Sequence, residues 1–406
     1  MRISTTQIFQ TGIDQIQRGQ SELNRTSLQM GRGERILKPS DDPSGMTQVN
    51  QFERIIQTTQ QYQRNIDNTQ PRLQQEESAL QGGTELLQRA RELVVAGNND
   101  SQNDETRSYI AGELRQLRDG LLDIANTRDP NGEYLFGGTR SLQQPFQQDG
   151  AGSVRYDGAT GAGSVREVAI SPSRKLPVGD DGERVFMAIP ENDGRVGAEV
   201  TNQVPGSRLV IEKTEVSDSA ALNDQTYTLS FEDLGGGELG YVIEDEGGAT
   251  VASGPYAPGA AIAFEGRSIT LSGTPEVGDE VQSRPARDKS VFETLDAVIG
   301  ALEEGGASGT TRAKLATASN TAFADLDAAL RNFNSIRAEV GSRLQAFDQQ
   351  RDVNEDRLVD LNSAVSEIRD LDYAEAISRF NQQQVALQAA QQTYTQVNRL
   401  SLFDFL

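Results

Sequence analysis

The stretch Phe9-Gln10-Thr11-Gly12-Ile13-Asp14-Gln15-Ile16 begins a pattern that decides how the chain is organised. Apolar residues recur every seven positions in the first and last segments. They are Phe9, Ile16, Leu23 and Met30, with Ile13 between the first two, and Tyr373, Phe380, Leu387 and Tyr394, with Val397 as a companion. A period of seven places such side chains along one seam of a helix, which must pair with another helix to leave water.

The adjoining segments repeat this period. Apolar positions recur through residues 52–94, 110–124 and 326–368, which predicts long helices on both sides of the middle of the chain. An ordinary bundle core and a coiled-coil seam both remain open for these inner helices. The outermost helices favour a coiled coil, because their apolar stripes are narrow and the companion positions Gln20, Ser27 and Gln383 are polar.

The N-terminal seam is too small to fix its helix in an isolated molecule. Burying its four anchors yields about 6–12 kcal/mol. Ordering about thirty residues costs about 30–60 kcal/mol of backbone entropy. We therefore expect both chain ends to be mobile in the free protein and to become ordered when they pack against neighbouring molecules.

The middle of the chain has a different composition. Residues 131–310 hold 28 of the 39 glycines and 9 of the 13 prolines. Short runs with period two, bounded by Gly, Asp or Pro, predict antiparallel strands, including Tyr134–Phe136, Val154–Tyr156 and Leu209–Val216. Gly235-Gly236-Gly237 predicts a tight turn.

The expected fold class is a multidomain α+β protein, with long terminal coiled-coil helices, a helical bundle built from both chain ends and a central antiparallel β region. The expected parts are an N-terminal helix (1–40), a bundle (41–132 and 285–369), an irregular β region (133–206), a β module (207–284) and a C-terminal helix (370–406).

Composition excludes several functions. The 406 residues include no histidine and no cysteine, which removes Ser-His-Asp triads, Cys-His nucleophiles, His-based metal sites and disulfides. A formal charge of −22 opposes general nucleic-acid binding. No stretch approaches the roughly 18 apolar residues of a membrane span. We expect no enzyme activity, cofactor, metal, nucleic-acid partner or membrane insertion.

A loop interrupts the N-terminal helices between Arg35 and Gly45. Pro39 and Pro43 cannot lie in a helix interior, and Asp42 before Pro43 predicts an N-cap and a first helical residue. For Arg35, Asp41 and Asp42, a role in fixing a subunit contact and a role in capping alone both remain open. Pro71 predicts a kink in the second helix, or a break after Gln70.

Both ends of the chain resemble the bacterial flagellin superfamily. Gly31–Ile36 followed by Ser40–Gly45 resembles the loop between its first two long helices, and Ser366–Glu375 resembles its terminal-helix motif. Three features are more similar to the superfamily's junction proteins than to its filament subunits. They are Asp42-Pro43, the run Tyr134–Gly138 and the ending Leu400–Leu406.

The resemblance implies a structural role outside the cell. Such proteins are exported through the flagellar type III channel with a cytoplasmic export chaperone. They assemble with copies of themselves into a ring and link hook-associated protein 1 to flagellin at the hook–filament junction. The two seams defined above would form the assembly interface.

Two alternatives remain. The chain could be a flagellin, the subunit of the filament itself. Alternatively, residues 207–284 could bind a glycan or another surface on a secreted scaffold, for which Tyr241 and Tyr256 are the only hint.

Overall fold

Long helices form both ends of the chain, and the strands lie between them in the sequence. The computed structural model describes residues 5–150 and 152–403. Its α-helices are α1 (Thr5–Arg32), α2 (Pro43–Gly97), α3 (Asp104–Ala125), α4 (Val291–Glu304), α5 (Gly309–Arg369) and α6 (Tyr373–Phe403). Together with the central antiparallel strands, they confirm the predicted α+β fold class.

Local chemistry sets where several helices begin. Asn103 caps α3 in a capping box, since its side chain accepts from the Thr106 amide at 2.8 Å and Thr106 Oγ1 accepts from the Asn103 amide at 3.0 Å. The Ser290 hydroxyl accepts from the Glu293 amide at the start of α4. Helix α2 begins at Pro43, as expected for a proline that follows an N-cap.

Helix α2 continues through Pro71. The break considered after Gln70 is therefore not present. Proline removes a single backbone hydrogen bond, whereas Ile66 and Leu73 on either side of Pro71 are fully buried. Tertiary packing on both sides holds the helix together across the missing bond.

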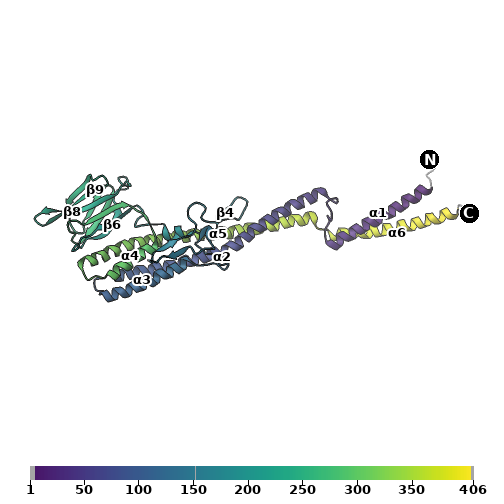
Figure 1. Cartoon of the computed structure of the whole chain (residues 1–406). Helices are drawn as coiled ribbons and strands as arrows, with labels where there is room; N and C mark the ends of the chain where they lie inside the picture. Colours follow the sequence, from purple (N-terminus) through teal and green to yellow (C-terminus); the bar gives the residue numbers. More distant parts are fainter. Residues whose placement is uncertain (1–4, 151, 404–406) are drawn as a thin grey trace. The chain divides into compact units, whose positions relative to one another are not determined.

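The chain divides into two compact units. One combines the N-terminal part up to Arg64 with the part that begins at Gln349, and the other comprises residues 65–348. In the first unit, α1 and α6 lie side by side, as the purple and yellow helices of Figure 1 show.

One hydrophobic core joins helices of the second unit to the segment that follows α3. Leu80 of α2, Leu121 of α3, Leu295 of α4 and Phe333 of α5 are fully or almost fully buried in it. The run Tyr134–Phe136 was expected to be a strand, but only Tyr134 makes an isolated bridge, and Leu135 and Phe136 lie in a turn. All three side chains are buried, and those of Leu135 and Phe136 belong to this core, so the run is apolar because of burial rather than sheet pairing.

Three short antiparallel strand pairs flank the β module in the sequence. They are β1 (Phe146–Gln148) with β2 (Val154–Tyr156), β3 (Glu167–Ala169) with β4 (Lys175–Pro177), and β5 (Ile189–Pro190) with β14 (Asp288–Lys289). The last pair joins the two stretches of chain that enter and leave the β module.

The β module contains two antiparallel sheets. One has the order β10-β9-β8-β13-β6 and the other β11-β12-β7. The strands are β6 (Val196–Asn202), β7 (Val210–Val216), β8 (Tyr227–Gly235), β9 (Glu238–Asp245), β10 (Thr250–Pro255), β11 (Ala261–Phe264), β12 (Arg267–Ser272) and β13 (Glu280–Pro285). Both sheets contribute to one core that is separate from the helical one.

The boundary expected at residue 207 requires correction. Strand β6 pairs with β13 from Val196↔Pro285 to Asn202↔Glu280, so the sheet begins at residue 196. The turn expected at Gly235-Gly236-Gly237 joins β8 to β9, and all three glycines have positive φ angles, of 91°, 73° and 87°. Side chains with a Cβ rarely adopt this backbone conformation.

Candidate assembly interface

Helices α1 and α6 pair in antiparallel fashion, as their contacts show. Near the start of α1, the Phe9 ring meets the Tyr394 ring edge to face, with centroids 6.1 Å apart. Further along, the Thr26 hydroxyl donates to Gln383 Oε1 at 2.8 Å. Near the end of α1, the Tyr373 hydroxyl donates to the Met30 carbonyl at 3.1 Å. The two predicted seams therefore face one another within a single chain.

Small residues, not Ile13, occupy the companion positions on α1. Gly12 lies against Tyr394, Gly19 lies against Leu387, and Thr26 is buried. Ile13 is 42% exposed and lies beside the seam rather than in it. The sequence interpretation missed Gly12 and Gly19 because it followed apolar residues, yet the same seven-residue spacing of small residues was a readable signal.

The seam is only partly closed. The predicted residues Phe9, Ile16, Leu23, Met30, Phe380, Leu387 and Tyr394 are half-buried. Tyr373 remains 52% exposed despite its hydrogen bond. Val397 belongs to α6, but its side chain lies outside the described residues. Pairing within one chain thus leaves much of this apolar surface in contact with water.

Further apolar side chains on the same helices face solvent. Leu28, Ile377 and Val385 are 59%, 48% and 66% exposed. Among the side chains that the structure describes, none from α1 or α6 belongs to either hydrophobic core. An exposed group of large apolar residues on a pair of helices is typical of a surface that another protein covers.

A short antiparallel crossing joins the loop after α1 to the loop after α5. The Arg35 amide donates to the Arg369 carbonyl at 2.7 Å, and the Leu371 amide donates to the Gly33 carbonyl at 2.9 Å. The Arg35 guanidinium adds two bonds to the Ile368 carbonyl, from Nη2 at 2.7 Å and from Nε at 3.2 Å. Arg35 therefore ties the loop after α1 to the last residues of α5.

Asp41 and Asp42 organise the same loop in different ways. Asp41 Oδ2 accepts from the amides of Leu37 and Lys38, both at 3.0 Å, and Asp41 Oδ1 pairs with Arg25 at 3.0 Å. Asp42 Oδ1 accepts from the Gly45 amide at 2.9 Å, which is the predicted N-cap of α2. The Gly45 bond chiefly, then Ser44 and Arg35, lower the pKa of the Asp42 carboxyl below its ordinary value.

The described residues show neither a metal-binding group nor a membrane-spanning helix. Within residues 5–150 and 152–403, no group of three or more Asp or Glu side chains is arranged to hold a metal ion. No helix in the described part of the chain is both long enough and apolar enough to cross a bilayer.

Both ends of the chain match known families. Residues 3–141 match the bacterial flagellin N-terminal helical region, and residues 323–406 match the bacterial flagellin C-terminal helical region. Flagellar hook-associated protein 3 of Escherichia coli strain K12 is 25% identical over 405 residues, which cover 100% of this chain and 99% of the relative.

Solved structures extend this similarity to the fold. The crystal structure of flagellar hook-associated protein 3 from Legionella pneumophila superposes with a TM-score of 0.75 at 28% identity, covering 79% of this chain and 98% of that one. Xanthomonas campestris FlgL in space group C2 gives 0.71 at 28% identity, covering 78% and 99%. The chain belongs to the flagellar hook-associated protein 3 family.

Members of the hook-associated protein 3 family are structural components of the bacterial flagellum. This chain is accordingly a secreted motility component of the hook–filament junction. The alternatives of a filament subunit and of a glycan-binding scaffold are not favoured. Its half-buried helix pair lies in the terminal regions that match the flagellin models.

Proposed function

We propose that the protein assembles into a ring through α1 and α6 and that this ring is its contribution to the junction. The observation that carries the proposal is the half-closed seam between these helices. A pair of helices with exposed apolar side chains gains free energy when neighbouring copies cover them. Contacts between unlike surfaces of successive copies generate rings when the rotation closes.

The proposed assembly surface comprises the seam residues predicted from the sequence on both helices, Val397 among them on the sequence pattern alone. Its members are Phe9, Ile13, Ile16, Leu23, Met30, Tyr373, Phe380, Leu387, Tyr394 and Val397. Ile13 and Tyr373 are exposed in the single chain, which makes their side chains accessible to a neighbour. The partly closed seam supports a division in which some contacts form within a chain and others form between chains.

Arg35, Asp41 and Asp42 shape the loop that a neighbouring copy would meet. Their hydrogen bonds lie mostly within the loop and across to the end of α5. In the proposed ring, Arg35 presents a fixed loop surface to the adjacent subunit, and the two aspartates hold that surface in place.

The partners on either side of the ring are hook-associated protein 1 and flagellin. The chain matches both flagellin helical regions, which supports flagellin as a partner. In the proposed assembly, the terminal helices of the two proteins are similar and pack against one another in one tube. A cytoplasmic chaperone that covers the apolar C-terminal helix before export would prevent premature association. The exposed Ile377 and Val385 of α6 suit such a cover.

This role requires no catalysis. The absence of histidine and cysteine from the sequence leaves few groups that titrate near neutral pH. We propose that the protein acts only through its binding surfaces.

The test replaces Phe380 with glutamate in the full-length chain. Phe380→Glu places a charge in the seam but touches neither hydrophobic core. We expect the thermal unfolding of the purified monomer, followed by circular dichroism, to stay unchanged, while cells that carry only this variant lose filament attachment to the hook.

The matched control is Gln384→Glu, which adds the same charge at an exposed position of α6. It should retain filament attachment. Retained attachment in Phe380→Glu would contradict the proposal. Cooperative destabilisation of the whole monomer would also contradict it, because Phe380 would then belong to a globular core.

A further inference from the structure

The β module and the helices beneath it have separate hydrophobic cores. No residue is shared between the core of the module and the core that joins α2, α3, α4 and α5. Inter-domain contacts that lack a common apolar core resemble transient interfaces, and relative motion is their default behaviour. The orientation of the module must therefore depend on other contacts.

Two stretches of chain form the neck of the module. Residues 189–195 enter and residues 286–289 leave, side by side. The Glu191 amide donates to the Arg287 carbonyl at 3.1 Å, and the Ala286 amide donates to the Arg195 carbonyl at 3.1 Å. A two-stranded ribbon of this kind can bend while its own hydrogen bonds persist.

Asn192, in this neck, bonds to two elements of the module and to α5. Its side-chain Nδ2 donates to the Thr214 carbonyl of β7 at 2.7 Å and to the Val196 carbonyl of β6 at 3.2 Å. Its amide donates to Asp325 Oδ1 at 3.0 Å, and its carbonyl accepts from Arg331 Nη2 at 2.9 Å. Asp325 and Arg331 both belong to α5.

The backbone of Asn192 is unusual. Its φ angle is +54°, one of two positive values among the non-glycine residues of the described chain. Asparagine tolerates this conformation better than most residues, though at some cost. The conformation lets the amide and carbonyl point toward α5 while the side chain reaches the sheet edges.

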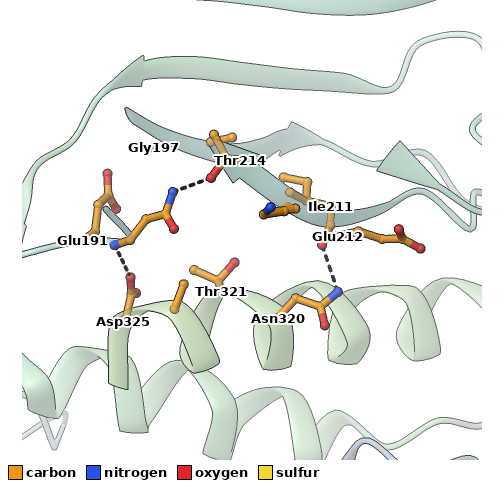
Figure 2. A pocket seen from close by; sticks show the side chains of 12 residues that line it. Glu191, Gly197, Ile211, Glu212, Thr214, Asn320, Thr321 and Asp325 are labelled. Carbon is orange, nitrogen blue, oxygen red and sulfur yellow. Dashed lines mark hydrogen bonds between the residues drawn. The ribbon is translucent and has the colours of Figure 1, made fainter. Parts of the chain in front are cut away.

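Polar contacts continue along the same surface. Asn320 Nδ2 on α5 donates to the Ile211 carbonyl of β7 at 3.0 Å, and the Ile211 amide donates to Thr317 Oγ1 at 3.2 Å. Asp325 is buried and also pairs with Lys289 at 2.9 Å. Figure 2 shows Asp325 and Asn320 on the helix facing Thr214 and Ile211 on the strand.

A cavity of about 80 Å³ lies among these residues, between β6, β7 and α5. The module and α5 are therefore not closely packed at this point. Close apolar packing would resist rotation of the module, and it is incomplete here. Directional hydrogen bonds are left to set the angle.

We infer that Asn192 is the positioning residue of the β module: it clamps the module to α5 in one orientation, and the module turns about its neck when this clamp opens. The inference concerns the outer module alone and does not depend on the proposed ring. A clamp of hydrogen bonds can open locally while both cores stay folded.

The test measures a distance between the module and the bundle in the full-length chain. The chain contains no cysteine, so thiol-reactive spin labels attach only to cysteines that are introduced. The two labelled positions are Glu246→Cys, at the exposed β9–β10 turn, and Gln116→Cys, on the exposed face of α3. Double electron–electron resonance should give a single narrow distance peak for the otherwise unmodified chain.

The decisive variant is Asn192→Gly, which keeps the positive φ accessible and removes both side-chain bonds. We expect loss of the narrow peak with an unchanged far-UV circular dichroism spectrum. The control is Asn202→Ala, which removes a comparable side-chain bond, to the Gly278 carbonyl at 2.7 Å, inside the module. It should keep the narrow peak.

Three outcomes would overturn the inference. They are a narrow peak in Asn192→Gly, a broad distribution already present before Asn192 is changed, and a broad distribution in the Asn202→Ala control. If Asn192→Gly fails to fold, the exposed variant Arg331→Ala decides. A broadened peak supports the clamp, and an unchanged peak overturns it.

Discussion

Gly12 of α1 lies directly against the ring of Tyr394 of α6, so that a Cβ atom at position 12 would stand 3.1 Å from Tyr394 Cδ2 and 3.6 Å from Cε2. Gly19, seven residues later, lies against Leu387 in the same way, with a distance of 3.4 Å from an added Cβ to Leu387 Cδ1. The two helices approach closely because glycine occupies these positions.

Gly12→Ala sets two effects against each other. Alanine favours the helix by about 1 kcal/mol relative to glycine, but its methyl group presses on the Tyr394 ring. We expect the helix content of the chain to be maintained or increased while assembly, measured as filament attachment in cells, declines.

Gly31→Ala serves as the control for this prediction. It lies on the same helix and has no atom within 4 Å of an added Cβ. It should leave attachment intact. An equal decline in both variants would show that helix propensity, rather than the contact with Tyr394, is responsible.

The N-cap of α2 should depend on pH. Hydrogen bonds from Gly45 and Ser44, with Arg35 nearby, lower the pKa of Asp42. A lowered pKa means that the stabilisation is present above the ordinary aspartate pKa and is lost as the pH falls through the lowered value. Amide exchange at Gly45, measured by NMR, should therefore accelerate in acid relative to the intrinsic rate.

Two substitutions separate charge from capping. Asn also caps helices well, so Asp42→Asn should keep Gly45 protected and abolish the acid-dependent change. Asp42→Ala should lose protection at every pH. Unchanged protection in Asp42→Ala would mean that the cap does not stabilise this end of α2.

Much of this architecture could be predicted from the sequence, for a physical reason. The positions of Phe9, Leu23, Phe380 and Tyr394 follow helix geometry, and helix geometry imposes a period that can be counted. The start of α2 at Pro43 follows from the missing amide of proline. Helix α1 already ends at Arg32, where Gly33 follows with a positive φ of 73°.

The remainder depended on contacts that are distant in sequence. Val196–Asn202 could not be assigned to the β module without knowing that β13 pairs with it. Pro71 is accommodated because buried neighbours hold α2 on both sides. Asn192 carries no signal in the sequence, since its role requires Asp325 and Thr214 to come together.

Glu76 of α2 provides a second prediction about pH. It is almost completely buried, and its Oε1 accepts from the Asp180 amide at 3.0 Å. Burial, followed by the nearby Asp180 carboxylate, raises the pKa of Glu76 well above its usual value. A raised carboxyl pKa lowers the stability of the fold as the pH rises from the ordinary value to the raised one.

Glu76→Gln should remove this decline, because glutamine can accept the same bond without a charge. Thermal unfolding between acid and neutral pH should then vary less than in the unmodified chain. Glu85→Gln, at an exposed position of the same helix, should leave the pH dependence as it was. An unchanged profile in Glu76→Gln would contradict the assignment.

The crossing between Gly33–Arg35 and Arg369–Leu371 has a mechanical consequence for a motility component. Backbone bonds run between the two loops at the points where α1 gives way to α2 and α5 gives way to α6. A pulling force on either terminal helix is thus shared between the two chain segments that these bonds connect. In a rotating filament, two polypeptide segments rather than one would then carry the mechanical load.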